Sequence, residues 1–86
     1  MSAPEKVGKK LLTSCHSGDF DGVRSSVNSG ASVDFQDAEG YTPAIKCCSR
    51  GHAEILKYLL EKGADADRAD NEGCTPLYIA AQENQI

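Results

Sequence analysis

Hydrophobic residues recur with helical spacing at three places along this chain. The strongest pattern follows Gly51-His52, where apolar side chains stand at i, i+1, i+4 and i+5: Ile55, Leu56, Leu59 and Leu60. This spacing places them on one face of a helix that ends before Gly63. A weaker pattern is Leu11, Leu12 and Cys15 in residues 7–16. In residues 19–28 the positions of the strong pattern hold Gly22, Val23, Ser26 and Val27, so half of that stripe is small or polar.

The chain repeats itself when it is shifted by 33 residues. Residues 7–43 and 40–76 share 10 identities in 37 gap-free pairs, where unrelated stretches would give about two or three. The identical pairs include Cys15 and Cys48, Gly18 and Gly51, Gly30-Ala31 and Gly63-Ala64, Asp37 and Asp70, and Thr42-Pro43 and Thr75-Pro76. Most of these residues favour turns or helix ends, so the repeated unit is a structural one.

The matched residues define where each element of the unit begins and ends. Thr42 and Thr75 can cap a helix, because a hydroxyl accepts a hydrogen bond from an otherwise unpaired N–H. The proline after each threonine then occupies the first helical position. Gly40 and Gly73 lie among Asp, Glu and Asn, which favour tight turns. The unit is therefore predicted as helix, short turn, helix, and an extended loop with a β-turn at its tip.

Four segments resemble the ankyrin repeat. They are Gly40-Tyr41-Thr42-Pro43, Gly51-His52-Ala53-Glu54-Ile55-Leu56, Leu59-Leu60-Glu61-Lys62-Gly63-Ala64-Asp65 and Gly73-Cys74-Thr75-Pro76-Leu77. The resemblance covers about residues 7–86. It implies an all-α solenoid of helix–turn–helix units with β-hairpin or β-turn fingers, about two and a half repeats long. It also implies a concave surface that binds proteins, and no catalytic activity of its own.

The sequence departs from the family's Thr-Pro-Leu-His motif. Ile45 and Tyr78 replace the histidine, and Ala44 replaces the leucine in the second repeat. In the family that histidine connects neighbouring fingers by hydrogen bonds, so its absence removes one source of rigidity expected for the fingers.

The single domain divides into four parts. We expect an N-terminal tail over residues 1–6, a capping-like repeat over 7–39, a complete internal repeat over 40–72 and a truncated third repeat over 73–86. Gly22 and Ser26 would form the polar outer face that a terminal repeat needs, with Val23 and Val27 facing the second repeat. A decayed repeat is the alternative.

The third repeat has no second helix, since Asn84 and Gln85 stand where Gly-His would introduce one. Three alternatives stay open. The chain is a fragment of a longer array, it is complete with a frayed end, or it forms a homodimer through the uncapped C-terminal end.

Composition narrows the class of partner. The formal net charge is −4, and the only cluster of basic residues is Lys6, Lys9 and Lys10, so neither composition nor spacing favours nucleic acid. No apolar run approaches a membrane span or a secretory signal. The four cysteines are then expected to be reduced thiols, which favours an intracellular protein of the cytoplasm, or alternatively of the nucleus.

Cysteine and histidine residues offer little chemistry. Cys47 and Cys48 stand where the family usually has alanine, and free cysteine behaves as a small buried hydrophobe. Cys74, at a finger base, is the best candidate for a reactive thiol. No cysteine or histidine pair has metal-ligand spacing, and no nucleophile–base set stands out. We therefore expect no enzyme, no metal and no cofactor.

The resemblance assigns contacts to the finger tips and to the exposed sides of the first helices. Carried over by position, the candidate partner-binding residues are His16, Ser17, Ala38, Glu39, Tyr41, Ser49, Arg50, Asn71, Glu72, Cys74, Gln82 and Glu83. Tyr41 is the best anchor, because tyrosine offers a large contact area at low entropic cost, and Arg50 is the best charged contact. The alternative for Tyr41 is that it only covers the neighbouring finger.

These observations predict a non-catalytic protein-interaction module or scaffold. Two alternatives are a structural spacer within a longer protein and a regulatory segment of an enzyme. The acidic tip residues Asp37, Glu39, Asp70 and Glu72 suggest a basic partner, although solvated turn charge is the simpler explanation.

Overall fold

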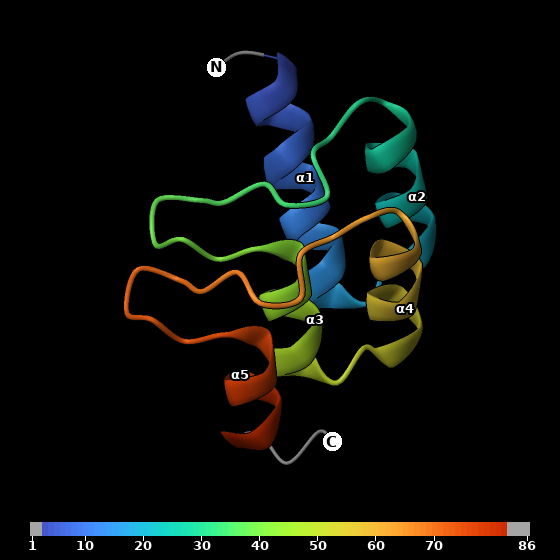
Figure 1. Cartoon of the computed structure of the whole chain (residues 1–86). Coiled ribbons are helices and arrows are strands. Elements are labelled where there is room, and N and C mark those ends of the chain that lie inside the picture. Colours follow the sequence, from blue (N-terminus) through green and yellow to red (C-terminus); the bar gives the residue numbers. More distant parts are fainter. Residues whose placement is uncertain (1–2, 83–86) are drawn as a thin grey trace.

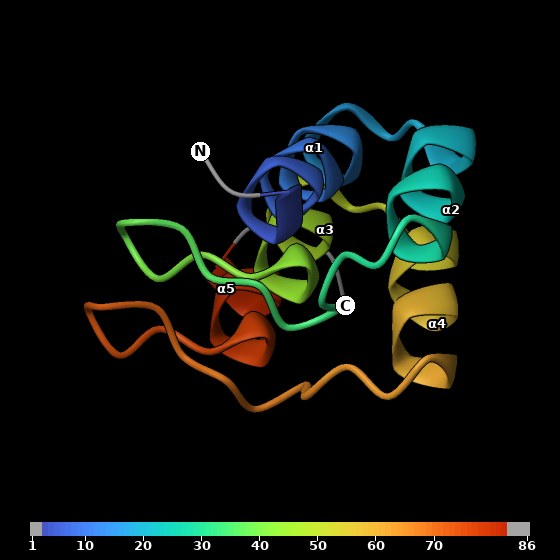
Figure 2. The ribbon, with the colours of Figure 1, turned by 90° about the horizontal axis from the view of Figure 1, so that it is seen from above.

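Five helices form two layers in the computed structural model, which describes residues 3–82. The helices are α1 (Ala3–Ser17), α2 (Phe20–Asn28), α3 (Pro43–Arg50), α4 (Ala53–Glu61) and α5 (Pro76–Gln82). One layer is formed by α1, α3 and α5, with α3 packed between the other two, and α2 and α4 lie side by side in the second layer (Figure 1). The loops 31–41 and 64–74, the two fingers, project from the first layer on the side away from α2 and α4 (Figure 2).

Side chains and glycines set the helix ends, at Thr42 and Thr75 as the sequence predicts. The Oγ1 atoms of Thr42 and Thr75 each accept a hydrogen bond from the backbone N–H three residues later, at 3.2 Å. Asp19 does the same for α2, accepting from Gly22 N at 3.0 Å. Gly51 ends α3 with a left-handed backbone, φ 74° and ψ 26°, which allows α4 to begin two residues later.

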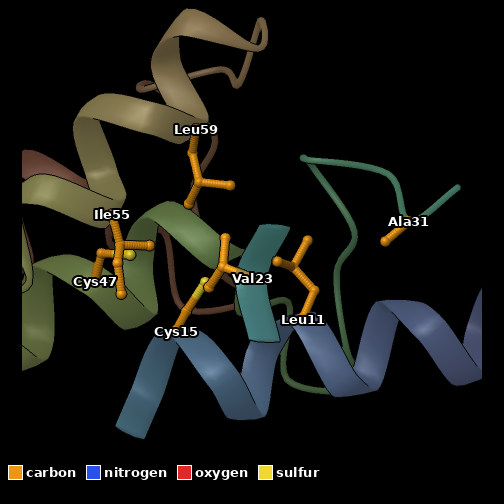
Figure 3. Close-up of a cluster of buried hydrophobic side chains, with 7 residues drawn as sticks. All are labelled: Leu11, Cys15, Val23, Ala31, Cys47, Ile55 and Leu59. Carbon is orange, nitrogen blue, oxygen red and sulfur yellow. The ribbon is translucent and has the colours of Figure 1, made fainter. Parts of the chain in front are cut away.

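The hydrophobic core lies between the two layers and joins the first two repeats. It is formed by Leu11, Cys15, Val23, Ala31, Cys47, Ile55 and Leu59, all buried (Figure 3). Every helix from α1 to α4 contributes at least one of these residues. Burial of each large aliphatic side chain contributes about 1.5–3 kcal/mol to folding, so Ile55 and Leu59 of the α4 stripe stabilise the fold together with Leu11 and Val23.

The prediction for Gly22 and Ser26 is wrong. Ser26 is only 1% exposed, and its Oγ donates to the carbonyl of Gly22 at 2.8 Å. Ser26 follows Val23 by three residues and therefore shares its inward face, where the internal hydrogen bond removes the cost of burying the hydroxyl. At Gly22 an added Cβ would meet Ser14 Oγ at 2.5 Å, so this position is also pressed against α1. The exposed face of α2 is formed instead by Asp21, Arg24, Ser25 and Asn28.

Two further differences concern the ends and the fingers. The first helix begins at Ala3, four residues earlier than expected, because Pro4 is tolerated in a first turn and Glu5 pairs with Lys9 at 4.0 Å. Within residues 3–82 no strand forms, so the fingers are closed by turns and not by a β-ladder. The division of the chain at residues 6, 39 and 72 stays a prediction.

Candidate functional site

The tips of the two fingers are built alike. In the first, Asp37 Oδ1 accepts hydrogen bonds from Glu39 N at 3.0 Å and Tyr41 N at 2.9 Å. In the second, Asp70 Oδ1 accepts from Glu72 N and Cys74 N, both at 2.9 Å. These two aspartates therefore hold the turns together. The acidic charge that the tips offer to a partner comes from the exposed Glu39 and Glu72.

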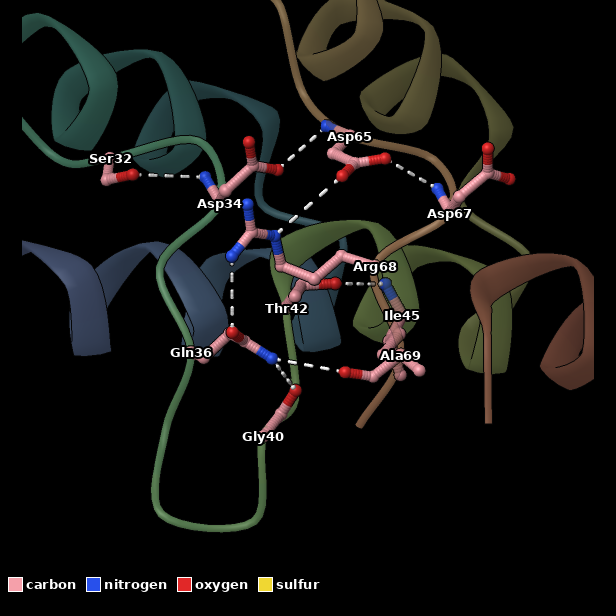
Figure 4. A network of polar contacts seen from close by, with 10 residues as sticks. All are labelled: Ser32, Asp34, Gln36, Gly40, Thr42, Ile45, Asp65, Asp67, Arg68 and Ala69. Atoms are coloured by element: carbon pink, nitrogen blue, oxygen red, sulfur yellow. Dashed lines mark hydrogen bonds and ion pairs between the residues drawn. The ribbon is translucent and has the colours of Figure 1, made fainter. Parts of the chain in front are cut away.

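Hydrogen bonds connect the two fingers to each other. Asn71 donates from its backbone N to Glu39 O at 3.0 Å and from its side-chain Nδ2 to Ala38 O at 2.8 Å. Gln36 Nε2 donates to Gly40 O at 2.9 Å and to Ala69 O at 3.2 Å (Figure 4). The amide groups of Asn71 and Gln36 therefore connect the two fingers in this chain, in which Ile45 and Tyr78 replace the family's histidine.

The bases of the fingers are joined by charged groups. Asp34 Oδ1 accepts from Asp65 N at 2.8 Å, and Arg68 Nη1 donates to Gln36 Oε1 at 3.5 Å (Figure 4). Arg68 Nε also lies 4.0 Å from Asp65 Oδ2. The fingers are thus connected along their length, from the bases to the tips.

Gly40 allows this close approach. Its φ is +82°, and an added Cβ would lie 2.7 Å from Asn71 N. Only glycine tolerates both the left-handed backbone and the contact with the next finger. The matching Gly73 has φ +83° but no atom within 4 Å of such a Cβ.

A hollow of about 400 Å³ lies between α1, α3 and the first finger. Its lining residues are Lys9, Leu12, Thr13, His16, Asp37 and Lys46. Lys46 Nζ stands 4.6 Å above the centre of the Tyr41 ring, which places the predicted anchor beside the hollow. Partial burial, followed by the carboxylates of Asp70, Glu72, Glu39 and Asp37, raises the pKa of the Tyr41 phenol, so the ring keeps its hydroxyl proton.

The structure places the candidate contact residues as follows. His16, Ser17, Ala38, Glu39, Arg50, Asn71, Glu72 and Gln82 are exposed, and Tyr41, Ser49 and Cys74 are half-buried. His16 lines the hollow and Tyr41 contacts Lys46 of its lining, whereas Asn71 uses its side chain to hold the first finger. Glu83 lies outside the described residues.

Sequence reasoning missed Lys46, Lys9 and Gln36. Lys46 could have been found, because it precedes the predicted contacts Ser49 and Arg50 by three and four positions and so shares their face of the helix. Gln36 could not, since its role depends on Ala69 of the next finger lying beside it.

The cysteines lie as the sequence suggests. Cys15, Cys47 and Cys48 are buried and free. A hydrogen bond with Cys15, followed by burial, raises the pKa of the Cys47 thiol, and burial raises that of Cys48. Cys74 is half-buried, and burial followed by the charges of Asp70 and Glu72 raises its pKa as well. It is accessible but poorly activated as a nucleophile.

His52 connects two helices by a hydrogen bond. It precedes α4, and its Nε2 lies 3.1 Å from the carbonyl oxygen of His16, to which it donates. This bond joins the end of α1 to the start of α4. In the part of the chain that the structure describes, no three His, Cys, Asp or Glu side chains form a cluster suited to a metal ion.

Paired helices in two layers, with hydrogen-bonded fingers repeating every 33 residues, define a helical repeat protein. The family model for ankyrin repeats, in three copies, matches residues 11–86, and the chain belongs to the ankyrin repeat family. Ankyrin repeats generally mediate protein–protein interactions, and the family is generally non-enzymatic. A search among curated proteins found none that matches this chain. None of the described helices has the length and apolar character needed to cross a membrane.

Proposed function

We propose that this chain is a non-catalytic module that binds a partner protein through one continuous surface. The surface, called here the finger face, consists of the two finger tips and the exposed sides of α1 and α3. The observation that carries the proposal is the hydrogen bonding of Asn71 and Gln36, which fixes two adjacent fingers in one arrangement beside the hollow.

Fixed fingers favour binding for a thermodynamic reason. A loop that must be ordered on association loses conformational entropy, and that loss subtracts from the affinity. Here the tips are already held by the aspartate turns and by the neighbouring finger. A partner therefore meets a surface that needs little rearrangement.

The charges of the finger face describe the partner it fits. Lys9 and Lys46 line the hollow and Arg50 is exposed on α3, whereas the tips present Glu39 and Glu72. A complementary partner places an acidic group near the helices and a basic group near the tips. Such a charge pattern fixes the orientation of the partner and discriminates against other proteins more than it increases the affinity.

The compartment we propose is the interior of the cell. Three of the four cysteines are buried as free thiols, and none is paired with another in a disulfide among the described residues. Free thiols of this kind fit a reducing environment.

A capture experiment with three purified variants tests the finger face. The full chain is immobilised and exposed to cell extract, and bound proteins are identified by mass spectrometry. Tyr41→Ala and Arg50→Glu each remove a predicted contact, and Lys57→Glu makes the same charge change on the exposed face of α4. We expect the unmodified chain and Lys57→Glu to retain the same partner protein. Tyr41→Ala and Arg50→Glu should each reduce the amount of partner retained at least tenfold.

Equal retention by all variants would place binding elsewhere on the molecule. No specific partner at all would favour the structural spacer. Circular dichroism of each variant shows whether the fold is intact, so that loss of binding is not mistaken for loss of structure.

A further inference from the structure

Charge is distributed unevenly over the finger face. The helices α1 and α3 carry five of the nine basic residues of the chain, which are Lys6, Lys9, Lys10, Lys46 and Arg50. Four of these side chains are exposed and Lys46 is half-buried. The two helices hold a single acidic residue, Glu5. Five positive charges and one negative charge therefore give these helices a formal charge of +4, in a chain whose net charge is −4.

The acidic residues are concentrated in the fingers. The loops 31–41 and 64–74 contain seven of the thirteen aspartates and glutamates, and one basic residue, Arg68. Several of these carboxylates are used by the fold, since Asp37 and Asp70 close the turns and Asp34 binds the next finger. Each element of the finger face thus has its own sign of charge.

The lysines of α1 and α3 have no comparable role in the fold. Within residues 3–82 they take part in one ion pair, between Lys9 Nζ and Glu5 Oε2 at 4.0 Å, and both of these side chains are exposed. An exposed pair of this kind contributes little to stability. The positive charge of these helices is therefore available to a partner.

The hollow lies where the basic helices meet the first finger. Lys9 lines it from α1 and Lys46 from α3, and the Thr13 side chain belongs to the same lining. Leu12 adds an apolar side chain that is 5% exposed. Asp37 lines the hollow too, but its Oδ1 accepts two backbone N–H groups of the turn. A carboxylate on a short aliphatic chain matches this lining, because the ammonium groups bind its oxygens and its methylene groups cover Leu12.

We infer that the basic side of the finger face binds an acidic segment of the partner protein, with one of its carboxylate side chains in the hollow. The inference rests on the proposed function, because it names the chemistry of the partner at that same surface. Lys46 and Arg50 stand four positions apart, on one side of α3. They extend the positive surface beyond the hollow, so further carboxylates of the segment lie along α3.

Two other occupants fit this surface less well. A nucleic acid carries a phosphate at every nucleotide, and it would meet the exposed carboxylates of Glu39 and Glu72 at the finger tips. A protein segment can instead place acidic residues over the helices and neutral or basic residues at the tips. A second copy of this chain would bring its own acidic tips, but the net charge of −4 on each copy opposes association.

The probe is a fluorescein-labelled acidic peptide, Gly-Ser-Glu-Leu-Glu-Asp-Phe-Glu-Leu-Asp-Ser-Gly. Fluorescence anisotropy is measured as the full chain is added at an ionic strength of about 0.15 M. The control peptide has Gln in place of each Glu and Asn in place of each Asp. We expect the acidic peptide to bind, the control peptide to bind at least tenfold more weakly, and the affinity of the acidic peptide to fall as salt is added.

Charge reversals in the protein locate the binding. Lys9→Glu and Lys46→Glu act in the hollow, and Lys57→Glu makes the same change in net charge on the exposed face of α4. We expect each of the first two variants to weaken binding at least fivefold, and Lys57→Glu to change it less than twofold. Lys46→Arg keeps the charge and should bind within about twofold of the unmodified chain, and circular dichroism shows whether each variant is folded.

Three peptide results would overturn the inference. They are no binding of the acidic peptide, equal binding of the two peptides, and an equal loss with the hollow variants and Lys57→Glu. Tighter binding of a labelled single-stranded DNA than of the acidic peptide would assign the lysines to nucleic acid. In sedimentation at several concentrations, a dimer abolished by Lys46→Glu would assign them to a second copy, and either result also overturns the inference.

The capture experiment and the peptide experiment can fail independently. A captured partner that depends on Tyr41, together with no binding of the acidic peptide, overturns the acidic segment and leaves the proposed function standing. Peptide binding that depends on Lys9 and Lys46, together with equal retention of the partner by all capture variants, contradicts the proposed function instead.

Discussion

The two fingers resemble each other more closely than do α2 and α4, the second helices of the first two repeats. The fingers have equivalent tips, closed by Asp37 and Asp70 with closely similar hydrogen-bond lengths. The helices α2 and α4 differ strongly, because Gly22 and Ser26 occupy the positions of Ile55 and Leu59. A turn is specified by one carboxylate and one glycine, whereas a helix face is specified by the volume that its neighbours leave open.

The largest expected effect lies in the helices. Leu59→Ala leaves a cavity in the core and should lower the free energy of unfolding by about 2–5 kcal/mol. Ser26→Ala removes one internal hydrogen bond and should change it by less than about 1 kcal/mol. Urea unfolding followed by circular dichroism measures both. Similar losses for the two variants would mean that α2 and α4 contribute equally to the core.

A smaller effect distinguishes the fingers. Gly40→Ala combines a left-handed backbone with a contact to Asn71, and it should destabilise the chain by about 2–3 kcal/mol. Gly73→Ala meets only the backbone strain, at about 1 kcal/mol. The same urea experiment compares them. If Gly73→Ala costs as much as Gly40→Ala, the close approach of the fingers is not what sets the difference.

The smallest effect concerns reaction rates of the cysteines. With iodoacetamide at pH 8, Cys74 should react first, and Cys15, Cys47 and Cys48 only when the core opens. Because burial and the nearby carboxylates raise the pKa of Cys74, its rate should be below that of a free cysteine at pH 8 and should rise as pH increases. Peptide mapping by mass spectrometry gives the order. Cys74→Ser should remove the early product, and early labelling of Cys47 would contradict the buried core.

Most of the fold could be predicted from the sequence, because the helix ends depend on local groups such as Thr42, Thr75 and Gly51. Ser26 was misplaced because polarity alone indicates exposure, and its partner, the Gly22 carbonyl, becomes available only once the helix forms. The exposure of most candidate contact residues could be predicted from their position in the repeat, whereas their use by a partner stays a prediction. The bonds of Gln36 and Asn71 could not, since they join segments 33 residues apart.

The place of α3 between α1 and α5, in contact with α4 as well, has a consequence for the order of folding. Its neighbours all lie in its own or an adjacent repeat, so ordering α3 closes only short loops and costs little chain entropy. Folding can therefore begin at α3 and α4 and spread outward in both directions. We expect the middle repeat to order early, because α3 packs against α1, α4 and α5, whereas α5 makes extensive contacts with α3 alone among the described helices.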